Sequence, residues 1–467
     1  MALLQGRIHI VGIGGAGMSG IARILCTRDA QVSGSDAKDS RRLQALVPIG
    51  AHVYVGHDAA RMLEHGAPDV IVASTAIPDT NPEIAKAREL GIPVLSRATA
   101  LAELVSQYKT ISVAGTHGKT TTTSMVTVIL QSAGMNPSFV IGSEMNESGS
   151  NAHQGTSPYF VVEADESDGT FLELNTTAAI VTNVEADHLN YWSDYQAIED
   201  AFVEFVNATK HNAGFAVICG DDLGARTVAL RARDTHTRVI TYGFTQENDA
   251  VITELAPAKD SHGSQFQIAY AGQVFGPIQL RVPGQHNILN ATAAALVASE
   301  IGCSVKQVVD GLHTFTGTHR RFEFRGQSAG VRVFDDYAHH PTEIDAVLRA
   351  ARSVVGTGRV IVAFQAHHYY RTALFSKEFG QALGLADYVV VLEVFAPGET
   401  PIPGASGSTM ASNVPLPADR VVFEPSWSAV ADHLVSFAVP GDIIMTLGAG
   451  DIGMMCPTIL ELLSTHA

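Results

Sequence analysis

The sequence has few cysteines and no long hydrophobic run. Its four cysteines, Cys26, Cys219, Cys303 and Cys456, lie far apart and form no Cys-x-x-Cys pair. This spacing excludes a disulfide framework and a zinc ribbon, and it is typical of reduced thiols in the cytoplasm. No segment approaches the roughly 20 consecutive apolar residues of a membrane-spanning helix, and the first residues lack the pattern of a signal peptide. We therefore expect a cytoplasmic protein without membrane insertion.

Charged residues are also scarce, and basic ones are the rarer kind. They make up 16% of the 467 residues, with 30 Lys and Arg against 47 Asp and Glu, which gives a formal net charge of −17. A phosphate polymer would be repelled overall, so nucleic acid is not expected as a partner. Hydrophobic residues, at 46%, favour compact domains over disorder. The length predicts two to four domains, and we expect a monomer or homodimer.

What the sequence does contain is a glycine turn at residues 110–123, T-I-S-V-A-G-T-H-G-K-T-T-T-T, between a strand and a helix. Such a turn directs backbone N–H groups and a helix N-terminus at an anion. Lys119 would reach the terminal phosphates of a nucleotide, and the Thr120 hydroxyl would hold Mg²⁺. The loop is not a full Walker A motif, because only Thr116 and His117 separate its glycines. The alternative is a glycine-rich turn with a solvated lysine, and the neighbouring motifs decide between the two.

A second glycine turn lies near the start of the chain. Residues 7–107 alternate β-rich and helical stretches, which predicts βαβ units and a parallel sheet. The turn G-I-G-G-A-G at 12–17, with Asp36 at the end of the next strand, matches the Rossmann dinucleotide fingerprint. Alone it favours an NAD-dependent dehydrogenase, although the pair Gly14-Gly15 would let a UDP diphosphate approach equally closely. Packing of the helix on the strand is the structural alternative.

Acidic and imidazole side chains follow two strands after the phosphate loop, in E-A-D-E-S-D at 163–168 and N-V-E-A-D-H at 183–188. Mg²⁺ prefers oxygen ligands, so Glu163 is a stronger candidate than His188. Solvated loop acids are the alternative. The stretch H-N-I-L-N at 286–290 begins an Ala-rich helix, where its polar side chains share a face or cap the helix.

The segment 319–467 predicts a third α/β unit. Polar side chains gather where its strands end, namely Asp335, Asp336, His339, His340, Gln365, His367, Arg371 and Asp451. In a parallel sheet this is the ligand edge. Two adjacent histidines after an Asp pair could suggest zinc or iron, but the segment has no matching ligand spacing. The Pro/Gly stretch 393–404 is expected to be an exposed loop.

Taken in this order, these motifs resemble the Mur ligases of peptidoglycan synthesis, and most closely the alanine-adding branch. The resemblance covers essentially the whole chain, through residues 11–22, 33–36, 114–123, 146–153, 163–168, 183–188, 284–291, 320–323, 335–343 and 447–452. It implies three α/β domains: a Rossmann-like UDP-binding domain at 1–107, a central P-loop ATPase at 108–317 and a C-terminal Rossmann-like domain at 318–467.

The resemblance also implies a reaction. An ATP- and Mg²⁺-dependent ligase would join L-alanine to the carboxylate of UDP-N-acetylmuramate. The carboxylate would attack the γ-phosphate to form an acyl phosphate, and the amine of alanine would then displace phosphate. Catalysis would rest on positioning and on neutralising charge around the phosphoryl group.

The family pattern implies a role for each motif residue. Lys119, Glu163, His188 and Arg371 would be catalytic, and the metal ligands would be Thr120, Glu163 and His188. Nucleotide contacts would come from Gly115, Thr116, His117, Gly118, Lys119, Thr120, Thr121, His286, Asn287, Asn290, Arg320 or Arg321, and Asp335 or Asp336. The sugar nucleotide would contact Gly12, Gly14, Gly15, Gly17, Met18, Ser35, Asp36 and Ser74, and the amino acid would contact Tyr337, His339 and Arg371.

One position departs from the family pattern. In F-Q-A-H-H-Y-Y-R-T at 364–372, His368 stands where a second arginine is usual, which leaves its contact with the amino-acid carboxylate open. The chain also has no lysine between Lys119 and Lys210, so it lacks the modified lysine that some sibling ligases place near the metals.

Three other functions are weighed against this expectation. The nearest is the recycling ligase that adds a preformed tripeptide to the same sugar nucleotide, but the ending M-T-L-G-A-G-D-I favours the alanine-adding enzyme. A dehydrogenase leaves the phosphate loop and both acidic strand ends unexplained. A non-catalytic, nucleotide-gated switch is a third class.

Overall fold

The computed structural model describes residues 3–28, 30–74, 76–146, 149–189, 191–258 and 263–465. Thr75, and Glu147 and Ser148 of the 146–153 motif, lie outside these ranges. The chain divides into two compact units, which are Met1–Leu255 with Phe266–Gln279 and Leu289–Phe315, and Ala256–Gln265 with Leu280–Ile288 and Thr316–Ala467. The described residues form three sheets with helices between their strands, which confirms the α/β class. The domain boundaries at 107 and 317 stay a prediction.

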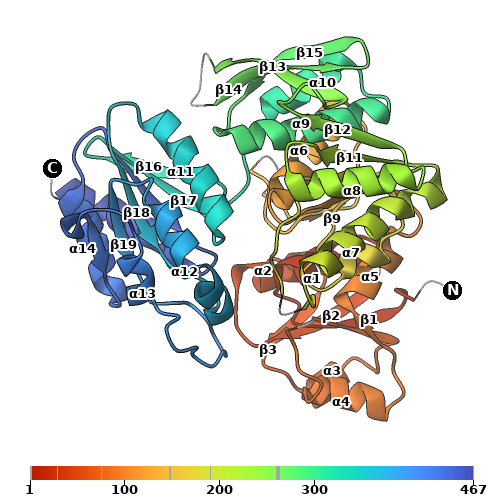
Figure 1. Ribbon diagram of the computed structural model, residues 1–467. Helices are drawn as coiled ribbons and strands as arrows, with labels where there is room; N and C mark the ends of the chain where they lie inside the picture. Colours follow the sequence, from red (N-terminus) through yellow and green to blue (C-terminus); the bar gives the residue numbers. More distant parts are fainter. Residues whose placement is uncertain are drawn as a thin grey trace. The chain divides into compact units, whose positions relative to one another are not determined.

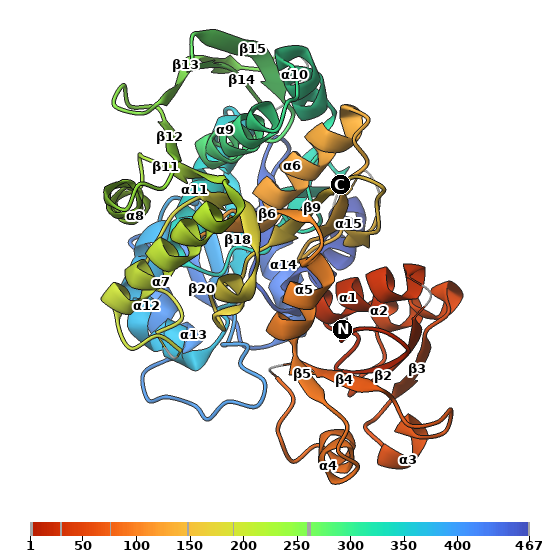
Figure 2. The same ribbon diagram turned by 90° about the vertical axis from the view of Figure 1, so that its right-hand side faces the viewer.

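The first sheet has five parallel strands in the order β3-β2-β1-β4-β5, with helices on both faces (Figures 1 and 2). Ile8 and Ile10 of β1 pack into the core beneath α1 and α5, whereas Val11 packs with Ile84 of α4 on the other face. The elements are β1 Arg7–Val11, α1 Ala16–Thr27, β2 Gln31–Asp36, α2 Arg41–Gln44, η1 Val47–Ile49, β3 His52–Val55, α3 Ala59–Met62, β4 Val70–Ala73, α4 Pro82–Glu89, β5 Val94–Ser96 and α5 Arg97–Val105.

The second sheet has ten strands in the order β15-β14-β13-β12-β11-β10-β6-β9-β7-β8. The strands β6, β10 and β11 are almost wholly buried. The core of this sheet is continuous with that of the first sheet, because residues of both belong to one cluster. The strands are β6 Lys109–Ala114, β7 Ser138–Val140, β8 Ala152–His153, β9 Tyr159–Glu163, β10 Thr176–Val181, β11 Phe215–Cys219, β12 Val239–Gly243, β13 Ala250–Pro257, β14 Ser264–Tyr270 and β15 Gln273–Leu280. The helices are α6 Lys119–Ser132, η2 Thr170–Glu173, α7 Tyr195–Ala208, η3 Thr209–Asn212, α8 Leu223–Asp234, α9 Gln285–Glu300 and α10 Val305–Thr314.

The third sheet has six strands in the order β16-β17-β21-β18-β19-β20, and only the edge pair β16–β17 is antiparallel. Helices α11 and α12 cover one face and α14 the other (Figure 1). The elements are β16 Glu323–Ser328, β17 Val331–Asp336, α11 Pro341–Val355, β18 Val360–Phe364, α12 Tyr369–Leu383, β19 Tyr388–Val391, α13 Gly407–Ser412, η4 Ala418–Arg420, β20 Val421–Phe423, α14 Trp427–Phe437, β21 Ile443–Leu447, η5 Asp451–Met455 and α15 Cys456–Thr465.

Two expectations from composition can be compared with the fold. All four cysteines are free thiols, so the predicted lack of a disulfide framework is confirmed. Within the described ranges, no helix is both long and apolar enough to cross a membrane.

Candidate active site

The phosphate loop lies where three parallel strands end side by side. β6 pairs with β9 on one side and with β10 on the other, with Val113 opposite Glu163 and Ala114 opposite Val181. The loop after β6 therefore meets Glu163 and the residues after Val181 at one sheet edge. This is the edge at which open parallel sheets bind ligands.

Two glycines give the loop its shape. Gly115 has φ +131° and Gly118 has φ +83°, backbone angles that residues with a Cβ rarely adopt. Gly118 is the N-cap of α6, and a Cβ there would come within 2.7 Å of Asn290 Oδ1. The structure therefore brings the predicted nucleotide residue Asn290 directly against the loop, although the two positions are 172 residues apart in the chain.

Asn183, after β10, holds the loop in place. Its backbone oxygen accepts from Thr116 N at 3.1 Å, and its Oδ1 accepts from His117 N at 2.7 Å. Its amide also donates to His117 O at 3.1 Å. These two loop N–H groups are therefore used inside the protein. The N–H groups of Lys119, Thr120 and Thr121, in the first turn of α6, have no intrahelical acceptor and are the ones suited to an anion.

Lys119 points back over the loop. Its Nζ donates to Gly115 O at 2.7 Å and to both carboxylate oxygens of Glu166 at 2.8 Å. Burial alone would lower the pKa of this ammonium, but Glu166 and Asp165 raise it above its usual range. Lys119 is therefore a fixed, fully charged cation at the sheet edge.

Two of the three predicted metal ligands, Glu163 and His188, lie near this cation, and the third, Thr120, follows it in the chain. Glu163 contributes to the field at Lys119, and His188 Nε2 lies 4.0 Å from Glu166 Oε1. Gly142 faces Glu163 so closely that a Cβ there would be 2.6 Å from Glu163 Oε2. Carboxylate and hydroxyl oxygens with space beside them fit a hard cation such as Mg²⁺.

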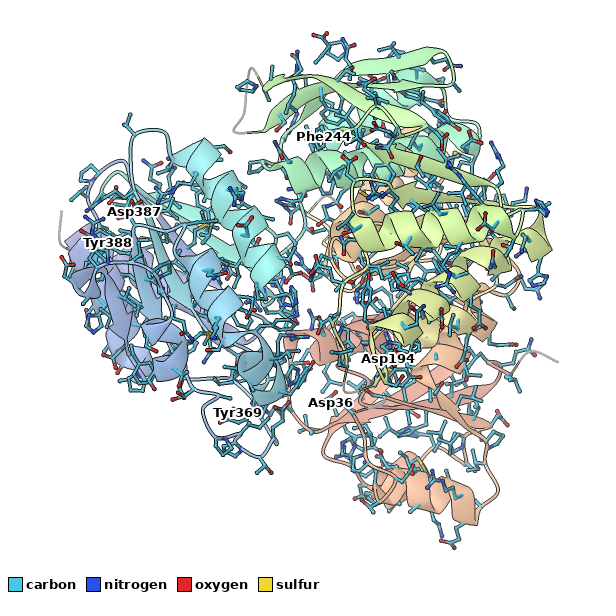
Figure 3. All side chains as sticks on the ribbon, viewed as in Figure 1. Asp36, Asp194, Phe244, Tyr369, Asp387 and Tyr388 are labelled. Atoms are coloured by element: carbon cyan, nitrogen blue, oxygen red, sulfur yellow. The ribbon has the colours of Figure 1, made fainter. Side chains whose placement is uncertain are left out.

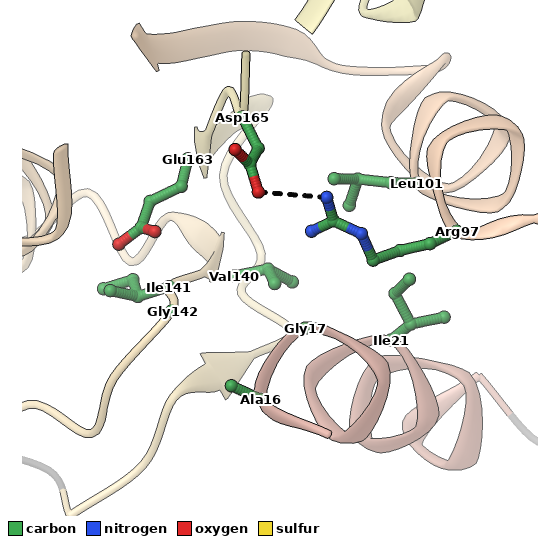
Figure 4. Close-up of a pocket in the computed structure, with 10 residues that line it drawn as sticks. All are labelled: Ala16, Gly17, Ile21, Arg97, Leu101, Val140, Ile141, Gly142, Glu163 and Asp165. Atoms are coloured by element: carbon green, nitrogen blue, oxygen red, sulfur yellow. Dashed lines mark hydrogen bonds and ion pairs between the residues drawn. The ribbon is translucent and has the colours of Figure 1, made fainter. Parts of the chain in front are cut away.

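A cavity of about 170 Å³ lies between α1 and the acidic end of β9 (Figure 4). Gly17 lines one side and Glu163 and Asp165 the other, with apolar walls from Ile21, Leu101, Val140 and Ile141. The cavity thus links the first glycine turn to the candidate metal ligand Glu163.

Arg97 joins the two sheets beside this cavity. Its Nη2 contacts Asp165 Oδ2 at 3.1 Å (Figure 4), and it also contacts Asp168 Oδ2 at 2.9 Å. Burial alone would raise the pKa of the Asp165 carboxyl, but the cations Lys119 and Arg97 lower it to about 2. Asp165 therefore stays ionised between two cations.

The residues predicted for the sugar nucleotide lie around the first turn, but they do not all face outward. Gly14 N donates to Asp36 Oδ2 at 2.9 Å, so Asp36 supports the turn itself. The buried Ser35 hydroxyl donates to Glu83 at 2.5 Å, and Met18 packs in the core. The remaining positions of this group, placed at the turn or at the end of β4, are Gly12, Gly15, Gly17 and Ser74.

A second group of predicted residues lies at the edge of the third sheet. Arg320 Nε donates to Asp335 Oδ2 at 2.9 Å, and its other nitrogens donate to the carbonyls of Gly448 and Gly450. Asp336 is buried and accepts from Phe322 N and Ala338 N, both at 2.7 Å. Burial raises its pKa to about 6. The charge of Arg321 opposes this rise. Both candidate arginines, Arg320 and Arg321, therefore lie near the two candidate aspartates, Asp335 and Asp336.

The histidines near this edge are held neutral. Burial, with Arg321 nearby, lowers the pKa of His286 to about 4. Burial likewise lowers the pKa of His339 to about 3 and that of His367 to about 4. His286 and Asn287 belong to the second compact unit and Asn290 to the first, because the boundary falls inside α9.

Arg371 is the buried cation of the predicted amino-acid site. It is 2% exposed and is the third residue of α12, with its guanidinium carbon 5.6 Å from the Tyr370 ring centre. His339 packs edge-on against Tyr337 at 5.2 Å and contacts Tyr337 O through Nδ1 at 3.0 Å. A buried guanidinium offers paired N–H donors, which suit a small carboxylate.

Sequence reasoning missed Arg97 and Gly142. Neither stands in a run that marks it, because each acts on a residue that is distant in the chain. Glu166 is one of four acids in the stretch 163–168, and nothing in the sequence around it marks it as the partner of Lys119.

Models of three parts of one family match this chain. They are the "Mur ligase family, catalytic domain" over residues 7–109, the "Mur ligase middle domain" over 113–298 and the "Mur ligase, glutamate ligase domain" over 320–450.

Similar proteins and structures carry related names. UDP-N-acetylmuramate–L-alanine ligase of Acidothermus cellulolyticus is 56% identical, covering 98% of this chain and 95% of that protein. The enzyme of the same name from Saccharopolyspora erythraea is 50% identical, covering 98% and 93%. The crystal structure of UDP-N-acetylmuramate-alanine ligase of Thermotoga maritima matches with a TM-score of 0.82 at 26% identity, covering 99% and 100%. A murein peptide ligase of Psychrobacter arcticus matches with a TM-score of 0.72 at 25% identity, covering 98% of each chain.

Proposed function

The chain belongs to the Mur ligase family, and from this membership we infer that it joins L-alanine to UDP-N-acetylmuramate with conversion of ATP to ADP and phosphate. Relatives at 50% and 56% identity over 98% of the chain carry this activity in their names. The supporting observation is the cluster of Lys119, Glu166 and Glu163 beside a cavity that leads to the first glycine turn.

The first half of the reaction activates the carboxylate. An oxygen of the muramate carboxylate attacks the γ-phosphorus, and the bond to the bridging oxygen breaks to release ADP. Lys119 and the N–H groups of the first turn of α6 neutralise the charge that develops on the phosphoryl oxygens. Lys119 must exchange Glu166 for the phosphate to do so. Thr120, Glu163 and His188 would hold Mg²⁺, which adds charge neutralisation at the same oxygens.

The second half forms the amide. The neutral amine of alanine attacks the acyl carbon, the bond from that carbon to the phosphate oxygen breaks, and phosphate leaves. The nitrogen gives up its extra proton to solvent. Arg371, as the buried guanidinium of the amino-acid site, is suited to orient the alanine carboxylate through paired hydrogen bonds. His339 supplies a neutral imidazole beside it, because burial keeps its pKa at about 3.

Several finer assignments belong to the same proposal. The glycines at 12, 14, 15 and 17 hold the diphosphate of UDP, which removes the need for NAD. Mg²⁺ is the metal, the protein works in the cytoplasm, and it is a monomer or homodimer. The segments 1–107, 108–317 and 318–467 act as domains for the sugar nucleotide, for ATP and for the amino acid.

The test measures phosphate release from ATP with UDP-N-acetylmuramate and either L-alanine or the preformed tripeptide. We expect turnover with L-alanine and little with the tripeptide. Turnover with the tripeptide alone would assign the protein to the recycling ligases. Absence of phosphate release with both acceptors, while nucleotide still binds, would indicate a nucleotide-gated switch.

A further inference from the structure

The loop that follows β19 is bound to the loop that follows β18. Phe395 N donates to Ala366 O at 2.8 Å, and His368 N donates to Phe395 O at 3.2 Å. His367 and Phe395 form a parallel β-bridge, and their rings stack with centres 5.8 Å apart. The segment predicted to be an exposed Pro/Gly loop is thus attached at its start, although most of 397–404 is exposed as expected.

Glu399 extends this attachment to the N-terminus of α12. Its Oε1 pairs with Nδ1 of His368, and its Oε2 accepts from Tyr369 N at 3.0 Å. Tyr369, labelled in Figure 3, is the first residue of α12, and the N-cap His368 forms no side-chain cap of its own. The carboxylate therefore caps the helix from another loop, where negative charge is favoured.

The backbone at His368 needs this support. His368 has φ +69°, which a residue with a Cβ adopts only when its surroundings hold it there. Burial alone would raise the pKa of the Glu399 carboxyl, but the hydrogen bonds from His368 and Tyr369 N lower it. The carboxylate is therefore ionised where it holds both groups.

Arg371 depends on the same turn. It is three residues after His368, in the first turn of α12, and it is buried. A change in the direction of this turn would move the guanidinium relative to Tyr337 and His339. His368, where the family pattern has a second arginine, is committed to Glu399.

We propose that Glu399 is a positioning residue for the amino-acid substrate: by holding His368 and the N-terminus of α12, it orients Arg371 and keeps the 393–404 loop beside the amino-acid site. This inference rests on the proposed function. In this proposal His368 binds Glu399 of the 393–404 loop, and Arg371 is the residue whose guanidinium binds the substrate carboxylate.

The test uses Glu399→Gln, which keeps an oxygen for Tyr369 N but removes the charge that pairs with His368. Glu378→Gln, on the exposed face of α12, is the matched control. In Glu399→Gln we expect the KM for L-alanine to rise about tenfold, with kcat and the KM values for ATP and UDP-N-acetylmuramate within about threefold. Glu378→Gln should match wild type.

Two further measurements separate positioning from general damage. Hydrogen–deuterium exchange of residues 393–404 in the ligand-free protein should be faster in Glu399→Gln and unchanged in Glu378→Gln. His368→Ala should raise the KM for L-alanine in the wild-type background and have a smaller effect in Glu399→Gln, because the two residues act as a pair.

An unchanged KM for L-alanine in Glu399→Gln, with active wild-type enzyme, overturns the inference whether or not exchange is faster. Equal losses for all three substrates overturn it too, because they indicate a structural role only. If wild type itself shows no L-alanine-dependent turnover, the proposed function fails first, and the amino-acid assignment of Glu399 fails with it.

Discussion

At the scale of single residues, the strongest prediction concerns the effect of Lys119 on turnover. The side chain is fixed by Gly115 O and Glu166, so its charge is already in place before a nucleotide arrives. Lys119→Ala should lose about 10²-fold or more in turnover, because one stabiliser of developing phosphoryl charge is removed. Phosphate release measures the loss. Lys109→Ala, at the exposed start of β6, is the control, and near-normal turnover of Lys119→Ala would contradict the mechanism.

A second prediction concerns Gly142, which faces Glu163, and the Mg²⁺ requirement of the reaction. In Gly142→Ala the new methyl group would meet Glu163 Oε2 at 2.6 Å, so the carboxylate must move. The Mg²⁺ concentration that supports half-maximal turnover should rise on the order of tenfold, in line with other changes next to metal ligands. The KM for UDP-N-acetylmuramate should change less. A variant with an unaltered Mg²⁺ requirement would remove Glu163 from the metal site.

Arg371 allows two roles that kinetics can separate. If it binds the alanine carboxylate, Arg371→Ala should raise the KM for alanine by about tenfold or more and leave the KM for ATP nearly unchanged. Arg349→Ala, on the exposed side of α11, serves as the control. Equal effects on both KM values would instead make Arg371 a nucleotide ligand.

At the scale of elements, Arg97 connects α5 to the turn after β9. Its contacts with Asp165 and Asp168 are partly buried, so its removal takes the paired cation from Asp168 and leaves Asp165 with Lys119 alone. Arg97→Ala should lower the free energy of unfolding by about 1–3 kcal/mol in urea titrations. Arg88→Ala removes the exposed pair with Asp79 and should cost less than about 1 kcal/mol. Equal decreases in the free energy of unfolding of the two variants would show that the Arg97 contacts stabilise the protein no more than an exposed ion pair does.

Element types were predictable wherever the apolar period was clear. The strand expected before the phosphate loop is present as β6, and the alternation of strands and helices expected over residues 7–107 is present from β1 to α5. The strands β1, β4 and β6 are largely buried and rich in β-branched residues. The short strands β3, β16 and β20 were not anticipated. They lie at sheet edges, and many of their residues are half-exposed. The alternation of apolar and polar residues along them is therefore weak. They form because they pair with a neighbouring strand.

At the scale of the whole molecule, three partly buried histidines make stability depend on pH. His286, His339 and His367 bind protons near pH 6.5 when unfolded, but folding lowers their pKa values to about 4, 3 and 4. Between these values the unfolded chain holds more protons, so stability falls as pH drops from about 6.5 to about 4. Asp336 acts oppositely, because folding raises its pKa from 3.8 to about 6. Because three histidines lower the stability on acidification and one aspartate raises it, we expect a net decrease in the free energy of unfolding as the pH falls.

Urea unfolding at pH 7.5, 6 and 5 checks this expectation. The free energy of unfolding should decrease with each step, and His286→Gln should show a shallower decrease than wild type. His313→Gln, which changes an exposed histidine at the end of α10, should keep the wild-type slope. A slope that His286→Gln leaves unaltered would show that this imidazole is not the group responsible.

The sequence by itself determined the α/β class, the order of the motifs and the family. These features are local, because a glycine turn, a lysine and the helix that follows are contiguous in the chain. Their spacing can therefore be read directly from the sequence. Only the tertiary structure decided which charged groups meet: Lys119 with Glu166, Arg97 with Asp165, and His368 with Glu399. The partners in each pair are 31 to 68 residues apart. Lys119 meets Glu166, and His368 meets Glu399, because neighbouring parallel strands end at a common edge. Arg97 and Asp165 follow strands of two different sheets, and they meet because these sheets share one core. Sheet order and the packing of the sheets decide these contacts, and no local pattern encodes either.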